Sequence, residues 1–207
     1  MTLVFLLEEP SMKALLEGLL PRLLSPAVEF LLIPHEGKSD LLRSIPRKLQ
    51  AWDDSEARFV VLVDQDSADC KERKTEFRRA CSKGGRPDTI VRIVCHELES
   101  WVLGDLRAVE AAFPASGLAR RQASAKYRDP DRLANAAQEL KRLVPAYQKL
   151  SGARNIGALL GDGPNTSLSF EVFRRTLASF GGTLLKEGRT APHWTSPSTP
   201  QPRARRR

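Results

Sequence analysis

Two aspartates stand directly after the most apolar stretch of the chain. Residues 59–63 are apolar and mostly β-branched, and Asp64 and Asp66 follow them. Such a run predicts a strand buried on both faces of a parallel sheet. Side chains alternate along a strand, so we expect both carboxylates on the same side just past its end. Two close negative charges favour a cation between them, and Mg²⁺ prefers oxygen ligands. Helix capping is the alternative explanation.

Acidic residues also follow two other predicted strands. Glu8 comes directly after residues 2–7, and Glu97 and Glu99 come shortly after residues 89–95. In an open parallel sheet these strand ends share one edge, which is where ligands bind. We therefore predict Glu8, Asp64 and Asp66 as metal ligands and catalytic residues. Glu97 and Glu99 start a predicted helix and face different directions, so one of them completes the site, unless both act only as helix-capping acids.

Three basic residues are candidates for contact with a nucleic-acid backbone. Lys38 follows the second predicted strand, and Lys149 and Arg154 lie in a glycine-rich segment. The triplet at 37–39 is similar to the end of a phosphate-binding P-loop, but Leu32 stands where that motif requires its first glycine. Nucleotide binding by that route is therefore excluded, and Lys38 is either a phosphate contact or a solvated lysine.

Four predicted strands, at residues 2–7, 28–33, 58–63 and 89–95, alternate with predicted helices. This order predicts right-handed crossovers and a four-stranded, mostly parallel sheet in a Rossmann-like three-layer α/β/α fold. Ser11 is expected to cap the first helix. Pro21 and Pro46 are expected to end or kink the helices that contain them.

The chain after Phe113 lacks strand patterns. We expect an α/β domain over 1–114, a small helical C-terminal appendage over 115–185, and a disordered basic tail over 186–207. One helix is predicted over 130–143. Trp101 lies on an apolar stripe that we expect to pack against the sheet. Asp105 lies on the same stripe and is expected either to cap a helix that restarts after Gly104 or to support the acids of the site from behind.

The chain carries a formal charge of +8, but six basic residues and one acid give the tail +5 of this. The tail could hold nucleic acid by its charge or be functionally idle. The odd number of cysteines, three, and the absence of a C-x-x-C pair predict reduced thiols in the cytoplasm and no zinc site. A basic leader and a long apolar run are both missing, which predicts neither a signal peptide nor a membrane span.

The turn at residues 8–11, Glu-Glu-Pro-Ser, and the later Asp-x-Asp pair resemble the TOPRIM domain. That domain is shared by topoisomerases, primases, old-family nucleases and the nuclease that matures 5S ribosomal RNA. The resemblance implies that Glu8 is the signature acid and that Asp64 and Asp66 are the acid pair. Glu9 stands where the domain usually has glycine. The chain has no tyrosine in a topoisomerase pattern, which argues against strand passage.

Over residues 1–180 the chain is also similar to the DUF4276 proteins, an uncharacterised bacterial family. The similarity lies in segments 9–13, 37–41, 63–67, 96–101 with 104–105, 127–131 and 149–154. It implies a fold more firmly than a reaction.

These observations lead to two hypotheses. The first is a nuclease, a Mg²⁺- or Mn²⁺-dependent phosphodiester hydrolase acting on DNA or RNA, in which Glu8 is a general base or a metal ligand. The second is a non-catalytic subunit that binds nucleic acid or a protein partner in a defence or mobile-element system. In that case the acids bind a structural cation or cap helices.

Overall fold

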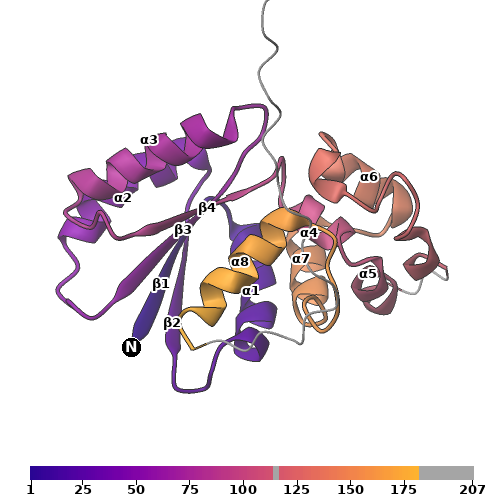
Figure 1. Ribbon diagram of the computed structural model, residues 1–207, viewed down its shortest axis with the longest axis horizontal. Coiled ribbons are helices and arrows are strands. Elements are labelled where there is room, and N and C mark those ends of the chain that lie inside the picture. The colour runs from indigo at the N-terminus through magenta and orange to yellow at the C-terminus, as the bar shows by residue number, and fades with distance from the viewer. Residues whose placement is uncertain (114–116, 182–207) are drawn as a thin grey trace, which may run out of the picture.

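A four-stranded parallel sheet lies at the centre of the computed structural model, which describes residues 1–113 and 117–181 (Figure 1). Its strands are β1 (Thr2–Leu7), β2 (Glu29–Pro34), β3 (Arg58–Asp64) and β4 (Ile90–Val94). They are ordered β2-β1-β3-β4, and every neighbouring pair is parallel. The central strands β1 and β3 are apolar along almost their whole length because helices cover both of their faces.

Helices cover the sheet on both faces, which confirms the three-layer α/β/α, Rossmann-like architecture. α2 (Lys38–Gln50) and α3 (Cys70–Lys83) pack on the face that carries Val4 and Leu6. α1 (Pro10–Leu23) and α8 (Leu168–Ala178) pack on the face that carries Phe5 (Figure 1). The remaining elements are α4 (Glu99–Leu103), α5 (Leu106–Ala112), η1 (Ala119–Arg121), η2 (Pro130–Arg132), α6 (Ala136–Leu143) and α7 (Lys149–Gly157).

Neither proline ends its helix, so that part of the expectation is wrong. α1 continues past Pro21, and α2 continues past Pro46. A proline removes one helical hydrogen bond, but Ile45 and Leu49 on either side of Pro46 are buried in the core. Packing of this apolar face outweighs the local cost.

Two further local predictions are also wrong. Ser11 is not the N-cap of α1, because the helix begins at Pro10 and Glu9 precedes it. Proline is well suited to this first position because it has no N–H to satisfy. The helix predicted over 130–143 is divided into η2 and α6, since the chain leaves helical geometry at Leu133 and Asn135.

The C-terminal helices share the apolar cluster on the α1 side of the sheet. The Trp101 ring lies 4.9 Å from that of Phe173 and 5.3 Å from that of Phe170, so it packs on α8. α7 lies close against α1, and a Cβ at Gly157 would stand 2.3 Å from the carbonyl oxygen of Leu15. Only glycine allows these two backbones to approach so closely.

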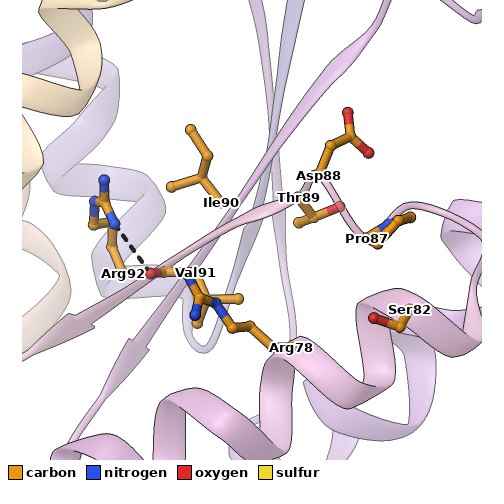
Figure 2. Close-up of a pocket in the computed structure, with 8 residues that line it drawn as sticks. All are labelled: Arg78, Ser82, Pro87, Asp88, Thr89, Ile90, Val91 and Arg92. Atoms are coloured by element: carbon orange, nitrogen blue, oxygen red, sulfur yellow. Dashed lines mark hydrogen bonds between the residues drawn. The ribbon is translucent and has the colours of Figure 1, made fainter.

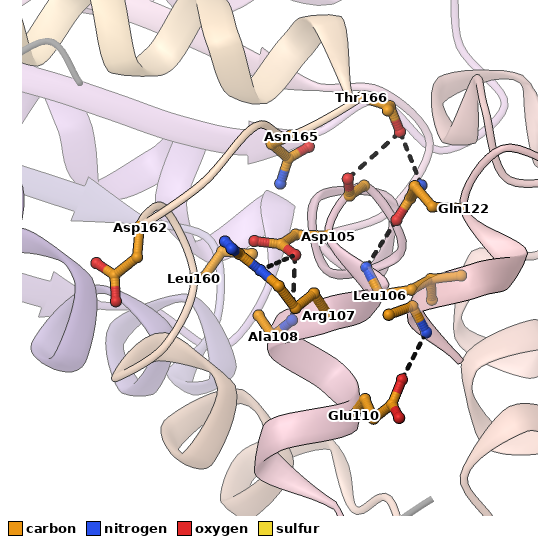
Figure 3. A network of polar contacts seen from close by, with 12 residues as sticks. Asp105, Leu106, Arg107, Ala108, Glu110, Gln122, Leu160, Asp162, Asn165 and Thr166 are labelled. Atoms are coloured by element: carbon orange, nitrogen blue, oxygen red, sulfur yellow. Dashed lines mark hydrogen bonds and ion pairs between the residues drawn. The ribbon is translucent and has the colours of Figure 1, made fainter. Parts of the chain in front are cut away.

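A polar network connects the α4–α5 corner to the segments that follow (Figure 3). The carboxylate of Asp105 accepts a 3.1 Å hydrogen bond from the amide of Ala108, which confirms the predicted helix cap. The side chain of Gln122 accepts from the Leu106 amide at 2.7 Å and donates to Thr166 Oγ1 at 3.0 Å. These contacts hold the loop before α8 against the start of α5.

The basic tail predicted over 186–207 lies outside the described residues. In the part of the chain that the structure describes, no helix has the length and apolar character needed to cross a membrane.

Candidate active site

Glu8 lies directly after β1, at the carboxyl edge of the sheet. Its Oε2 accepts a 2.9 Å hydrogen bond from the backbone amide of Asp64, and its Oε1 lies 3.7 Å from Lys38 Nζ. Burial raises the pKa of the Glu8 carboxyl, while the Asp64 amide and the Lys38 charge oppose this rise. The net effect of the surrounding site is to raise the pKa of Glu8 above its ordinary value.

Asp64 is the last residue of β3 and is only 5% exposed. Burial raises its pKa well above the ordinary value, and the charges of Glu8, Glu9 and Glu99 raise it further. Its Oδ1 is buried and has no hydrogen-bond partner within residues 1–113 and 117–181. A buried carboxylate oxygen without a partner is costly, so this atom is suited to accept a proton or a ligand.

Asp66 lies beyond the end of β3, in a turn with unusual backbone geometry. Asp66 and His96 both have left-handed φ angles, 53° and 57°, and the Asp66 amide donates a 2.9 Å hydrogen bond to the His96 carbonyl. Such residues are strained and need support from the surrounding fold. The alternation of side chains along β3 therefore does not extend to Asp66. The Asp66 carboxylate is connected to Glu8 by Lys38, whose ammonium contacts both side chains.

The structure separates the two glutamates that follow β4. Glu99 is 1% exposed, its Oε1 accepts a 3.1 Å hydrogen bond from the Tyr147 hydroxyl, and burial raises its pKa. Its charge also raises the pKa of Asp64. We call the group formed by Glu8, Glu9, Asp64, Asp66 and Glu99 the acidic edge. Glu97 instead accepts a 2.8 Å hydrogen bond from the amide of Ala137, in the first turn of α6. Glu97 therefore caps a helix, and Glu99 lies on the side of Asp64.

Of the basic residues, Lys38 and Lys149 join the acids and Arg154 does not. Lys149 Nζ donates a 2.6 Å hydrogen bond to Glu9 Oε2. Burial by itself lowers the pKa of Lys149, but this hydrogen bond and the Glu9 charge raise it above its ordinary value. Arg154 is exposed on α7 and takes part in none of the ion pairs found among the described residues.

Two residues of this edge were missed by sequence reasoning. Glu9 pairs with Lys149 and adds to the field on Asp64, but the sequence shows it only as a departure from the TOPRIM turn. Tyr147 has no local signal, because its partner Glu99 lies far away in the chain. Only the packing of the segment before α7 brings Tyr147 to the site.

The donor atoms of this edge are of the kind that hard cations prefer. Asp64 Oδ1 and Glu99 Oε2 are both buried carboxylate oxygens that lack a hydrogen-bond partner within the described chain. An oxygen-only set fits Mg²⁺ or Mn²⁺. Within the described ranges, no group of three or more His, Cys, Asp or Glu side chains is arranged so that it could hold a metal ion. Lys38 and Lys149 instead supply the positive charge.

The chain matches the model of a family described as a domain of unknown function, DUF4276, over residues 7–178. It belongs to the DUF4276 family. The match includes every residue of the acidic edge and also Lys149. No curated protein and no solved structure matches this DUF4276 chain.

Two other acids, Asp131 and Glu139, have structural roles away from this edge. Asp131 accepts hydrogen bonds of 2.7 Å from both the Ser167 hydroxyl and the Ser169 amide, at the start of α8. Tyr127 donates to Glu139, whose pKa is lowered to about 2, chiefly by the hydrogen bond from Arg142. These acids are fully paired, in contrast to Asp64 and Glu99.

Proposed function

We propose that this DUF4276 chain is a nuclease, a Mg²⁺- or Mn²⁺-dependent phosphodiester hydrolase acting on DNA or RNA. A single observation carries the proposal, the state of the Asp64 carboxylate. It is buried at the end of a central strand, and its Oδ1 has no hydrogen-bond partner within the described chain. The charges of three other acids, Glu8, Glu9 and Glu99, add to the rise of its pKa. A cation would offset this repulsion. The resemblance of Glu8, Asp64 and Asp66 to the TOPRIM acids gives independent support.

Each side chain has a role in this proposal. Asp64 and Asp66 would hold the cation, Glu8 would be either a third ligand or the general base, and the buried Glu99 would hold a water beside them. When bound, the cation supplies charge stabilisation at the phosphate and lowers the pKa of a coordinated water. Glu8, whose pKa is raised, is the best placed general base. Lys38, once released from the carboxylates, would contact the phosphate.

The proposal is tested by thermal melts with and without Mg²⁺. A cation that binds only the folded state stabilises it, by about 2.7 kcal/mol at a concentration 100 times Kd. The wild type should show this shift, and Asp64→Asn and Glu8→Gln should lose it. Glu97→Gln is the matched control, because Glu97 caps α6 and its loss should lower stability without removing the metal response. An equal Mg²⁺ shift in Asp64→Asn and the wild type would contradict the proposal.

Hydrolysis is measured with labelled single- and double-stranded DNA and RNA in Mg²⁺, Mn²⁺ or EDTA. Cleavage should require the metal, disappear in Asp64→Asn and persist in Glu97→Gln. Equal cleavage by Asp64→Asn and the wild type would show that the reaction does not use this edge.

The ion pairs of Lys38 and Lys149 favour a second candidate, a non-catalytic binding subunit in which the acids are structural. The two lysines already neutralise Glu8, Asp66 and Glu9. Lys38→Gln separates the two functions. In the nuclease it removes a competitor of the metal and should strengthen the Mg²⁺ response. In a structural network it should lower the melting temperature equally with and without metal.

A further inference from the structure

A groove lies along the outer edge of β4, and its lining includes one acidic residue, Asp88 (Figure 2). It has a volume of about 380 Å³ and is lined by Arg78 and Ser82 of α3, residues 87–89 and the first three residues of β4. β4 is an edge strand, since in the described sheet it pairs only with β3. The groove is therefore open along one side of the sheet.

Two cations, Arg78 and Arg92, line this groove, and a third, Lys74, lies beyond its lining on α3. Lys74 and Arg78 lie one turn apart on α3, and Arg92 lies on β4. Burial lowers the pKa of Arg92 and the charge of Arg78 lowers it further; burial, Arg92 and Arg78 all lower the pKa of Lys74. None of the ion pairs within residues 1–113 and 117–181 includes any of the three. Asp88 also lines the groove, but its carboxylate forms an ion pair with none of the three within the described ranges.

Neutral groups hold the guanidinium of Arg92 in place. Its Nε donates a 2.5 Å hydrogen bond to Thr176 Oγ1 of α8. Its Nη1 donates a 3.4 Å hydrogen bond to the carbonyl of Val91 (Figure 2). Arginine does not lose its proton in proteins, so the charge persists despite half-burial. A preorganised cation of this kind is ready to pair with a phosphate, whose geometry suits arginine.

We propose that this groove binds the phosphate backbone of a nucleic-acid strand, with Arg92, Arg78 and Lys74 contacting its phosphates. The assignment rests on the proposed function, because the bound strand would be the substrate. α3 runs antiparallel to the strands of its crossover, so Lys74 lies nearer the carboxyl edge than Arg78 does. The row of cations therefore leads along β4 toward the acidic edge that begins beyond Val94.

Binding of single-stranded DNA to the full chain in EDTA tests the groove without hydrolysis. The probe is a fluorescently labelled strand of about 20 nucleotides, measured by anisotropy from about 50 to 200 mM salt. Each neutralised phosphate contributes about 0.7 to the slope of log K against log salt. The triple variant Lys74→Gln, Arg78→Gln, Arg92→Gln should lower this slope by about 2 and weaken low-salt binding at least about tenfold.

The matched control removes the same charge from α2, with Arg43→Gln, Arg47→Gln and Lys48→Gln. It should bind more tightly and with a steeper slope than the groove variant. Equal binding by the two triple variants, or no binding by the wild type at low salt, would overturn the groove. Arg78→Gln alone keeps the test decisive if the triple variant fails to fold, because Arg78 is exposed. Its slope should fall by about 0.7.

Failure of the groove and failure of the nuclease can be told apart. Asp64→Asn should bind the strand in EDTA with an unchanged slope, since no metal takes part. Loss of binding in the groove variant without metal-dependent cleavage by the wild type would support the groove and contradict the nuclease. Metal-dependent cleavage by the wild type, together with unchanged DNA binding in the groove variant, would support the nuclease and contradict the groove.

Discussion

The backbone amide of Asp64 donates a 2.9 Å hydrogen bond to Oε2 of Glu8. This contact connects the end of β3 to the first residue after β1, and it fixes the Glu8 carboxylate beside the buried Asp64 side chain. Burial raises the pKa of both acids; the amide opposes this rise at Glu8, while the Glu8 charge adds to it at Asp64.

Asp64→Asn should stabilise the metal-free protein at neutral pH. The folded-state pKa of Asp64 lies above its ordinary value of 3.8, so the folded state holds this proton more tightly than the unfolded chain does. Stability from Asp64 is greatest below that ordinary value and falls as pH rises through the folded-state pKa. The variant should therefore gain about 1 kcal/mol at pH 7, and the gain should disappear in acid. Urea melts across this pH range measure it.

A capping role for Asp64 predicts the opposite sign. Loss of a helix cap costs about 1 kcal/mol. A lower stability of Asp64→Asn at neutral pH would therefore contradict the repulsion that we infer among the acids.

Glu139→Gln should have the reverse pH dependence. The pKa of Glu139 is lowered to about 2, first by the Arg142 hydrogen bond and also by those of Lys126 and Tyr127. Its stabilising effect is present above the ordinary value of 4.5 and is lost as pH falls toward about 2. We expect a loss of about 1–2 kcal/mol at pH 7, reduced because Lys126 and Arg142 are partly exposed to solvent. Equal stability of variant and wild type at pH 7 would show that these bonds contribute nothing.

Trp101→Ala should destabilise the fold by about 3–5 kcal/mol, the range for loss of a buried aromatic side chain. The indole is fully buried against Phe170 and Phe173, and its Nε1 donates a 2.9 Å hydrogen bond to Ser169 Oγ. Trp101→Phe keeps a ring but loses this bond, so it should cost less. Red-shifted, easily quenched fluorescence from Trp101 would contradict its burial.

Gly157→Ala should destabilise the contact between α1 and α7. Alanine favours a helix over glycine by about 1 kcal/mol, but its Cβ would stand 2.3 Å from the Leu15 carbonyl oxygen. The backbones must separate, at a cost of about 1–3 kcal/mol. Ser151→Ala, at an exposed position of the same helix, should change stability by less than about 0.5 kcal/mol. A gain of stability in Gly157→Ala would mean that the helices are less closely packed.

Much of the sheet could be predicted from local patterns. The strand expected over residues 2–7 is β1 with the same bounds, and the strand expected over residues 58–63 is β3, which extends one residue further to Asp64. Continuous apolar runs predict buried parallel strands because both faces of such strands are covered. Alternation with helices then predicts one common edge for Glu8 and Asp64. These features depend on residues close together in the chain.

The tertiary structure alone decided which side chains meet at that edge. It placed Glu99 with Asp64 and directed Glu97 to α6, although both follow the same strand. It also brought Tyr147 to Glu99 and Lys149 to Glu9 across long stretches of sequence. Secondary structure follows from short-range periodicity, but partners such as these depend on how α6 and α7 pack. That packing depends on close contacts between distant segments, such as Gly157 against Leu15, which no local pattern encodes.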